Sequence, residues 1–94
     1  MVYIALTHPY KDFDKAAIES FTFHKNGKII FSYYVFLTED NILFNKSISI
    51  TDTSSVEKIK SASYVNYTSY DAICRVLLET LIKDGSEIGN IEVM

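Results

Sequence analysis

"SFTFHKNGKIIFSYYVFLT", residues 20–38, decides the fold class, because it has the pattern of two β-strands joined by a tight turn. Asn26-Gly27 is the favoured pair for a two-residue type I′ hairpin turn. Apolar side chains occupy both alternating faces of residues 28–38, which predicts a central strand covered on two sides. One face carries Ile29, Phe31, Tyr33, Val35 and Leu37, and the other carries Ile30, Ser32, Tyr34 and Phe36.

Further strands are predicted on both sides of this hairpin. After a turn at residues 38–41, residues 42–50 alternate between apolar and polar side chains, which indicates a half-exposed strand with Ile42, Phe44, Ile48 and Ile50 on one face. Residues 2–6 form a short strand that we expect to end before Pro9, because proline cannot donate to a ladder. Residues 10–21 leave two interpretations open, a short helix capped by Asp12 or Asp14 and the beginning of the β pattern.

The second half of the chain predicts two helices and a last strand. Ser54 with Glu57 fits a capping box, which indicates a short helix near residues 55–61. Thr68 with Asp71 fits a second box, and Asp84-Gly85 is a typical helix end. Residues 90–94 form the final strand. On the longer helix, Asp71, Arg75, Glu79 and Lys83 make a solvated stripe of ion pairs, and Tyr70, Ile73, Leu77 and Leu81 face the sheet.

Length and composition predict a single small domain over residues 1–94, with 48% hydrophobic residues. The net charge of −3 and the absence of a basic cluster argue against binding to duplex nucleic acid. Cys74 is the only cysteine, so an intrachain disulfide and a thiolate zinc cluster are excluded. Without a signal-peptide pattern or an apolar run of membrane-spanning length, we expect a cytoplasmic protein that does not enter a membrane.

Two stretches resemble the ribonuclease H-like family. Residues 18–23 (IESFTF) are similar to its first strand, where a hydrophobic run ends in a catalytic aspartate. Residues 68–81 (TSYDAICRVLLETL) are similar to its first helix, which carries a catalytic glutamate after an alanine. A three-strand meander, a capped helix and a strand form the opening half of that fold. The fold class we expect is therefore α+β, an antiparallel β-meander with one main covering helix and a final strand, ribonuclease H-like in part.

The same resemblance implies that the active site of the family is missing. The first aspartate falls at Phe23, or at His24 if the register slips by one, and the helix glutamate falls at Ile73. The third acid follows the fourth strand, where this sequence ends at Met94. Magnesium requires oxygen ligands, which apolar side chains do not offer. We therefore expect a catalytically degenerate copy, without metal or cofactor, that is not an enzyme.

Three tyrosines, Tyr64, Tyr67 and Tyr70, recur at every third residue and lead into the longer helix. Free amides at the helix start, together with the Thr68 and Ser69 hydroxyls, could hold an anion while the tyrosines stack on a base. The alternative is that the rings close over the edge of the sheet with their hydroxyls in water. A small ligand or nucleotide bound at residues 64–69 is thus one candidate function.

Leu78 and Ile82 lie beside the charged stripe of the longer helix, away from the face that covers the sheet. The helix is therefore apolar over a wider arc than a single sheet requires. Either a second element or another chain covers these residues, and we take an interface between identical subunits as the working hypothesis.

These observations favour a non-enzymatic domain that binds a protein partner or itself, as a homodimer. By analogy of size and type, such a domain suits a viral or mobile-element inhibitor of a host protein. Binding of a small ligand or nucleotide at residues 64–69 is the rival hypothesis.

Overall fold

Four consecutive strands pair with their neighbours in sequence, because alternating apolar side chains and tight turns recur from residue 2 to residue 50. The structure, a computed structural model, describes residues 1–65 and 69–93. Two helices follow the four strands, and a fifth strand then joins the sheet beside β1. The elements are β1 (Val2–Tyr10), β2 (Phe13–Phe23), β3 (Ile29–Thr38), β4 (Asn41–Ile50), α1 (Thr53–Val65), α2 (Ser69–Lys83) and β5 (Gly89–Val93).

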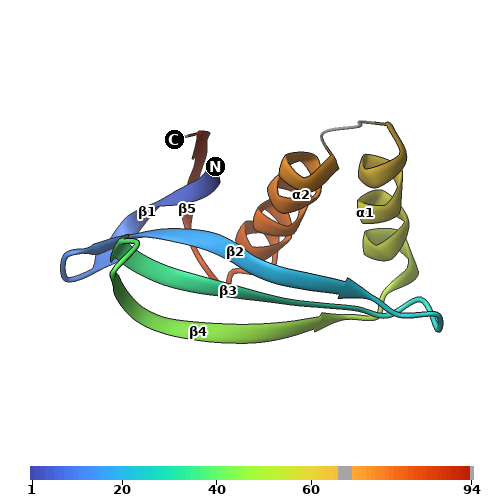
Figure 1. The fold of residues 1–94 in the computed structure, drawn as a ribbon, viewed down its shortest axis with the longest axis horizontal. Helices are drawn as coiled ribbons and strands as arrows, with labels where there is room; N and C mark the ends of the chain where they lie inside the picture. The colour runs from blue at the N-terminus through green and yellow to red at the C-terminus, as the bar shows by residue number, and fades with distance from the viewer. Residues whose placement is uncertain (66–68, 94) are drawn as a thin grey trace.

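The five strands form one antiparallel sheet in the order β4-β3-β2-β1-β5. Both helices lie on the same side of this sheet (Figure 1). The α+β class, the meander and the final strand are confirmed. The meander, however, has four strands rather than three, and two helices rather than one cover the sheet. A resemblance to the ribonuclease H-like fold is not confirmed.

The first hairpin differs from the prediction in two ways. β1 continues through Pro9 to Tyr10, because its pairing with β2 is irregular between Ala5 and Tyr10, where a missing N–H is tolerated. Lys11 turns the chain with a positive φ of 57°, and β2 begins at Phe13. The short helix considered for residues 10–21 is therefore wrong, since pairing with β3 along the length of β2 outweighs the local capping signal.

The second hairpin lies where Asn26-Gly27 predicted it, but its turn is of another type. Gly27 has a φ of +85°, but the φ of Asn26 is not positive. A type I′ turn needs a positive φ at both of its central residues. The Gly27 amide donates to the His24 carbonyl at 3.1 Å, and the His24 amide donates to the Lys28 carbonyl at 2.8 Å. This is a three-residue loop, in which a type I turn is followed by a left-handed glycine.

β3 is an interior strand with only one face under the helices, so the prediction of cover on two sides is wrong. The side chains from Ile29 to Val35 are alternately buried and half-buried. Phe36 points to the open face and is still only 2% exposed, because its ring packs 4.9 Å from that of Tyr34 and beneath the Lys15 ammonium group. A local cluster on the open face therefore replaces a second layer.

β4 is an edge strand whose pairing with β3 shifts near its start. Val35 lies opposite Phe44, whereas Phe36 lies opposite Ile42, so Leu43 is an extra residue on β4. The bulge turns Ile42 to the open face, where its side chain is exposed. The prediction that Ile42 shares a face with Phe44 is therefore wrong.

The helices form where predicted, with a different cap on the first. Asp52 rather than Ser54 caps α1, since its carboxylate accepts a hydrogen bond of 2.9 Å from the Ser55 amide. Gly85, with a φ of +81°, follows the end of α2 as predicted. Ile73, Leu77 and Leu81 are buried in the core, as expected for the face of α2 toward the sheet.

The charged side chains of α2 behave differently from the predicted stripe. Within residues 1–65 and 69–93, the ion pair of this helix joins Glu79 to Lys58 of α1 at 3.5 Å, not to a residue of α2 itself. Glu79 therefore pairs with a residue of the neighbouring helix. The spacing within α2 alone predicts Arg75 or Lys83 as its partner. In the same part of the chain, no helix is long and apolar enough to cross a membrane.

Candidate functional site

The edge of β2 loses its neighbour halfway along the strand. β1 pairs with β2 up to Ile4 opposite Ala16, whereas it stays paired with β5 as far as Val2 opposite Val93. Beyond Ala16, β1 and β2 therefore separate. Among the described residues, none pairs with β2 from Ile18 to Phe23 on this side, although on the opposite side every residue of this segment except Glu19 is paired with β3.

The hydrogen-bond pattern of the hairpin fixes which backbone groups reach this open edge. The His24 amide donates to Lys28 across the β2–β3 ladder. Bonded and non-bonded positions alternate along an antiparallel pair, so Thr22 and Ser20 also direct their backbone groups toward β3. The N–H and C=O groups of Phe21 and Phe23 consequently point outward, away from β3.

A β-bulge lies at the beginning of the open edge. Ile18 is opposite Tyr33 and Ser20 is opposite Ser32, so Glu19 is an extra residue on β2. The Glu19 carboxylate turns across the sheet and accepts a hydrogen bond from the side-chain amide of Asn45 on β4. Bulges re-aim side chains and end regular pairing, and this one lies where β1 departs.

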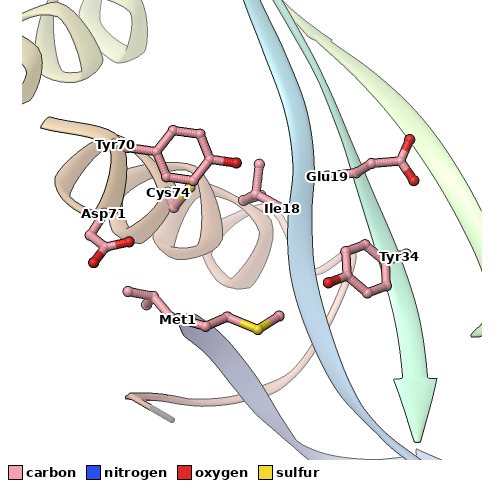
Figure 2. A pocket seen from close by; sticks show the side chains of 8 residues that line it. Met1, Ile18, Glu19, Tyr34, Tyr70, Asp71 and Cys74 are labelled. Atoms are coloured by element: carbon pink, nitrogen blue, oxygen red, sulfur yellow. The ribbon is translucent and has the colours of Figure 1, made fainter. Parts of the chain in front are cut away.

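Two side chains of α2 face the open edge of β2. Figure 2 shows Tyr70 and Cys74 across from Ile18, with Asp71 farther from β2, above Met1. The Tyr70 ring is 56% exposed and packs 5.6 Å from the Phe21 ring. Phe23 is 38% exposed and its ring lies 5.8 Å from that of Phe21. The open edge therefore has a continuous aromatic border.

A pocket of about 360 Å³ lies between α2, the beginning of β1 and the bulge of β2, a size at the small end of ligand pockets (Figure 2). The charged side chains that line it, Asp71 and Glu19, are both acidic, and the amino group of Met1 lies near enough to affect Cys74. The lining residues are Met1, Val2, Ile18, Glu19, Tyr34, Tyr70, Asp71 and Cys74.

Burial governs the chemistry of the two weak acids in this pocket. It raises the pKa of the Cys74 thiol, and the hydrogen bond from Tyr70 opposes that rise only in part. The pKa of Tyr70 is raised as well, chiefly by burial and then by Cys74. Both groups are therefore neutral near pH 7, and a neutral, buried thiol is a poor nucleophile. The pocket offers shape, backbone groups and negative charge rather than a reactive group.

A second polar centre is buried on the helix side of the sheet. Glu87 is 5% exposed and accepts hydrogen bonds from the Tyr33 hydroxyl at 2.7 Å and the Tyr10 hydroxyl at 3.1 Å. Burial, followed by the interaction with Glu87, raises the pKa of Tyr33 and of Tyr10. This centre ties β1, β3 and the α2–β5 loop together. Sequence reasoning missed it, because its members come from three distant segments with no shared spacing.

The candidate sites predicted from the sequence fare differently. Tyr67 and Thr68 lie outside the described residues, and Tyr64 and Ser69 are placed only as parts of α1 and α2. The nucleotide hypothesis at residues 64–69 thus stays a prediction. Tyr70, the last of that series, lies at the pocket and is largely exposed.

The interface predicted at Leu78 and Ile82 has an explanation within one chain. Leu78 is fully buried and Ile82 is half-buried against the same core, to which α1 contributes Val56 and Ile59. The width of the apolar face left two possibilities, cover by a second element of the same chain or by another chain. In the structure, α1 of the same chain packs in the core with Leu78. Leu78 has no surface to offer to another subunit in this fold.

Potential metal ligands stay dispersed. Asp12 lies in the β1–β2 turn, Glu39 and Asp40 lie in the β3–β4 turn, and Asp14 pairs with Lys15 at 2.9 Å. Residues 1–65 and 69–93 contain no group of three or more His, Cys, Asp or Glu side chains able to hold a metal ion. Comparison of the chain with protein-family models, curated proteins and solved structures gives no match.

Proposed function

We propose that the protein is a non-enzymatic protein-binding domain whose binding surface is the open edge of β2, from Ile18 to Phe23. The observation that carries the proposal is the set of outward backbone groups at Phe21 and Phe23, bordered by exposed aromatic rings. An unpaired strand edge is a template for pairing with another chain. Aromatic side chains are enriched where proteins bind one another.

The other long edge of the sheet supports the choice of β2. β4 carries the bulge at Leu43 and directs Lys46, opposite Tyr33, toward the helix side of the sheet. Bulges and inward-pointing charges are devices that discourage pairing at an edge. The β2 edge carries a bulge only at its beginning and presents aromatic rings beyond it. β4 therefore carries features that discourage strand pairing, whereas β2 beyond its bulge presents features that favour binding.

The proposal includes no catalytic residue, metal or cofactor. Inhibition of a host protein by a virus or mobile element would be one form of such binding. A homodimer, the other partner expected from the sequence, loses its original argument once α1 covers Leu78. It stays a prediction that the experiments below decide.

Affinity capture with an edge variant tests the proposed function. Phe23→Lys places a charge on the open edge, and Ile88→Lys makes the same change at an exposed apolar residue of the α2–β5 loop. We expect the wild-type protein and Ile88→Lys to retain the same partner and Phe23→Lys to lose it. Equal retention by all three proteins, with unchanged folding by circular dichroism, would refute binding through β2.

A further inference from the structure

We infer that the β2 edge accepts an extended peptide segment of another protein, as an added β-strand lying between β2 and the first turns of α2. The inference rests on the proposed function and specifies its partner. An added strand satisfies outward N–H and C=O groups directly, and Phe21 and Phe23 present such groups. A globular surface without an exposed strand could reach these groups only through individual side chains, not through a regular ladder.

The side chains beside the edge specify the pattern of the peptide. Successive residues of a strand point to opposite faces of the sheet. On the helix side, an added strand meets Phe21, Tyr70 and Ile18, which are apolar or aromatic. On the open side it lies beside Ser20 and Thr22, which are exposed and polar. The partner segment should therefore alternate between apolar and polar residues.

Charge specifies one further residue of the peptide. Asp71 stands at the beginning of α2, where it lines the pocket, and no lysine or arginine side chain lines this pocket among the described residues. Glu19, the other acidic residue there, is already engaged by Asn45. A lysine or arginine at the Ile18 end of the added strand, with its long side chain directed into the pocket, would approach Asp71. An acidic peptide would be repelled by the two carboxylates.

A peptide fits this edge better than a second copy of the chain does. In a two-fold pairing of β2 with β2, the helix layers of both copies would lie on the same side of the joined sheet. Tyr70 of α2 already stands 5.6 Å from Phe21, beside the edge itself. The two α2 helices would then meet above the new pair of strands. An extended segment carries no helix layer and avoids that collision.

Selection from a display library of random dodecapeptides, with the full chain as the immobilised target, tests the inference. We expect the enriched peptides to alternate apolar and polar residues and to contain lysine or arginine. Asp71→Asn should weaken a synthetic version of the most enriched peptide about two- to fivefold, as an exposed ion pair would. Asp12→Asn, the same change in the β1–β2 turn, should have no effect.

Backbone methylation of that peptide tests strand pairing itself. N-methylation of the peptide residues whose amides face β2 should weaken binding about tenfold or more, because each methyl group blocks a hydrogen bond to β2. Methylation of the intervening residues, whose amides face away from β2, should leave binding unchanged. Amide exchange at Phe21 and Phe23 should slow in the complex. Insensitivity to methylation, or protection of β4 residues 41–50 instead, would overturn the inference.

The remaining outcomes separate this inference from the proposed function. If no peptide is enriched but capture of a folded partner still depends on Phe23, the inference fails and the proposed function stands. If light scattering shows a dimer that Phe23→Lys dissociates, the occupant is a second copy and the inference likewise fails. If neither peptide nor protein binds in a Phe23-dependent manner, both fail.

Discussion

Glu87 is the one charged side chain that the fold buries among the described residues, and two tyrosine hydroxyls make that burial possible. Burying a carboxylate without such donors is costly, so Tyr33 and Tyr10 stabilise the protein beyond their apolar surface. The neutral, protonated tyrosine is the form that donates. The buried Glu87 centre therefore contributes to both the stability and the pH dependence of this protein.

Removing one hydroxyl from this centre should destabilise the protein. Tyr33→Phe deletes the 2.7 Å bond to Glu87 and should lower the free energy of unfolding by about 1.5–3 kcal/mol, as expected for a hydrogen bond to a charged group. Urea denaturation measures the change. Tyr3→Phe is the matched control, because its exposed hydroxyl lies 3.4 Å from Glu92 and should contribute less than about 0.5 kcal/mol. Equal losses in both variants would contradict the prediction.

Alkaline pH should weaken the same centre. The pKa of Tyr33 is raised in the fold above its ordinary value of 10.0, because burial and Glu87 both disfavour the phenolate. Its stabilising contribution is therefore complete below pH 10.0 and is lost as the pH rises through the folded-state pKa. The unfolding free energy of the wild type should fall more steeply above pH 10 than that of Tyr33→Phe. Parallel curves for the two proteins would refute this assignment.

At the scale of elements, β2 has two unequal edges, since β3 pairs with it from Lys15 to Phe23, apart from the bulge, whereas β1 pairs with it only as far as Ala16. Local sequence does not show this difference, because residues 18–23 have an ordinary strand pattern. The departure of β1 toward β5 produces it. A single strand can therefore be both a core element and a binding edge.

Amide hydrogen exchange should reveal the two edges residue by residue. The amides of Phe21 and Phe23 face the open edge and should exchange at least about tenfold faster than those of Ser20 and Thr22, which face β3. Nuclear magnetic resonance spectra recorded after transfer to deuterated water measure the four rates. Equal protection at all four residues would mean that the edge is covered in solution.

The β1–β5 pair depends on a glycine. A Cβ atom at Gly89 would lie 2.2 Å from the backbone carbonyl oxygen of Ala5, which cannot move aside as a flexible side chain could. Gly89→Ala should therefore loosen β5 and lower the free energy of unfolding by about 1–3 kcal/mol. Asn90→Ala, at the next and exposed residue, should change it by less than about 0.5 kcal/mol. Thermal melts of both variants test this pair.

At the scale of the molecule, local patterns predicted most elements but not their arrangement. The hairpin at Asn26-Gly27, the face of α2 with Leu77 and the helix end at Gly85 follow from neighbours in sequence, and they are confirmed. The extension of β1 through Pro9 and the strand at residues 13–23 depend on partners far away in the chain. Periodicity carries no information about such partners.

The candidate site was largely out of reach for the same reason. The spacing of the tyrosines singled out Tyr70, but most of the other residues that line the pocket come from distant segments, including β1, β2 and β3. The separation of β1 from β2 after Ala16 has no signature in either strand. The apolar width of α2 at Leu78 was correctly noticed, and only the choice between covering elements needed the structure.

Because Val2 pairs with Val93, the two ends of the described chain emerge side by side on one rim of the sheet (Figure 1). A loop of a larger host protein could therefore receive the whole domain as an insertion with little strain at the junctions. A circular permutant, closed by a short linker here and reopened at Glu39-Asp40, should keep the fold. In such a permutant the new ends at Glu39-Asp40 would lie away from the β2 edge, because that part of β2 pairs with residues 29–33, and the linker would join the chain beside the pocket that Met1 lines.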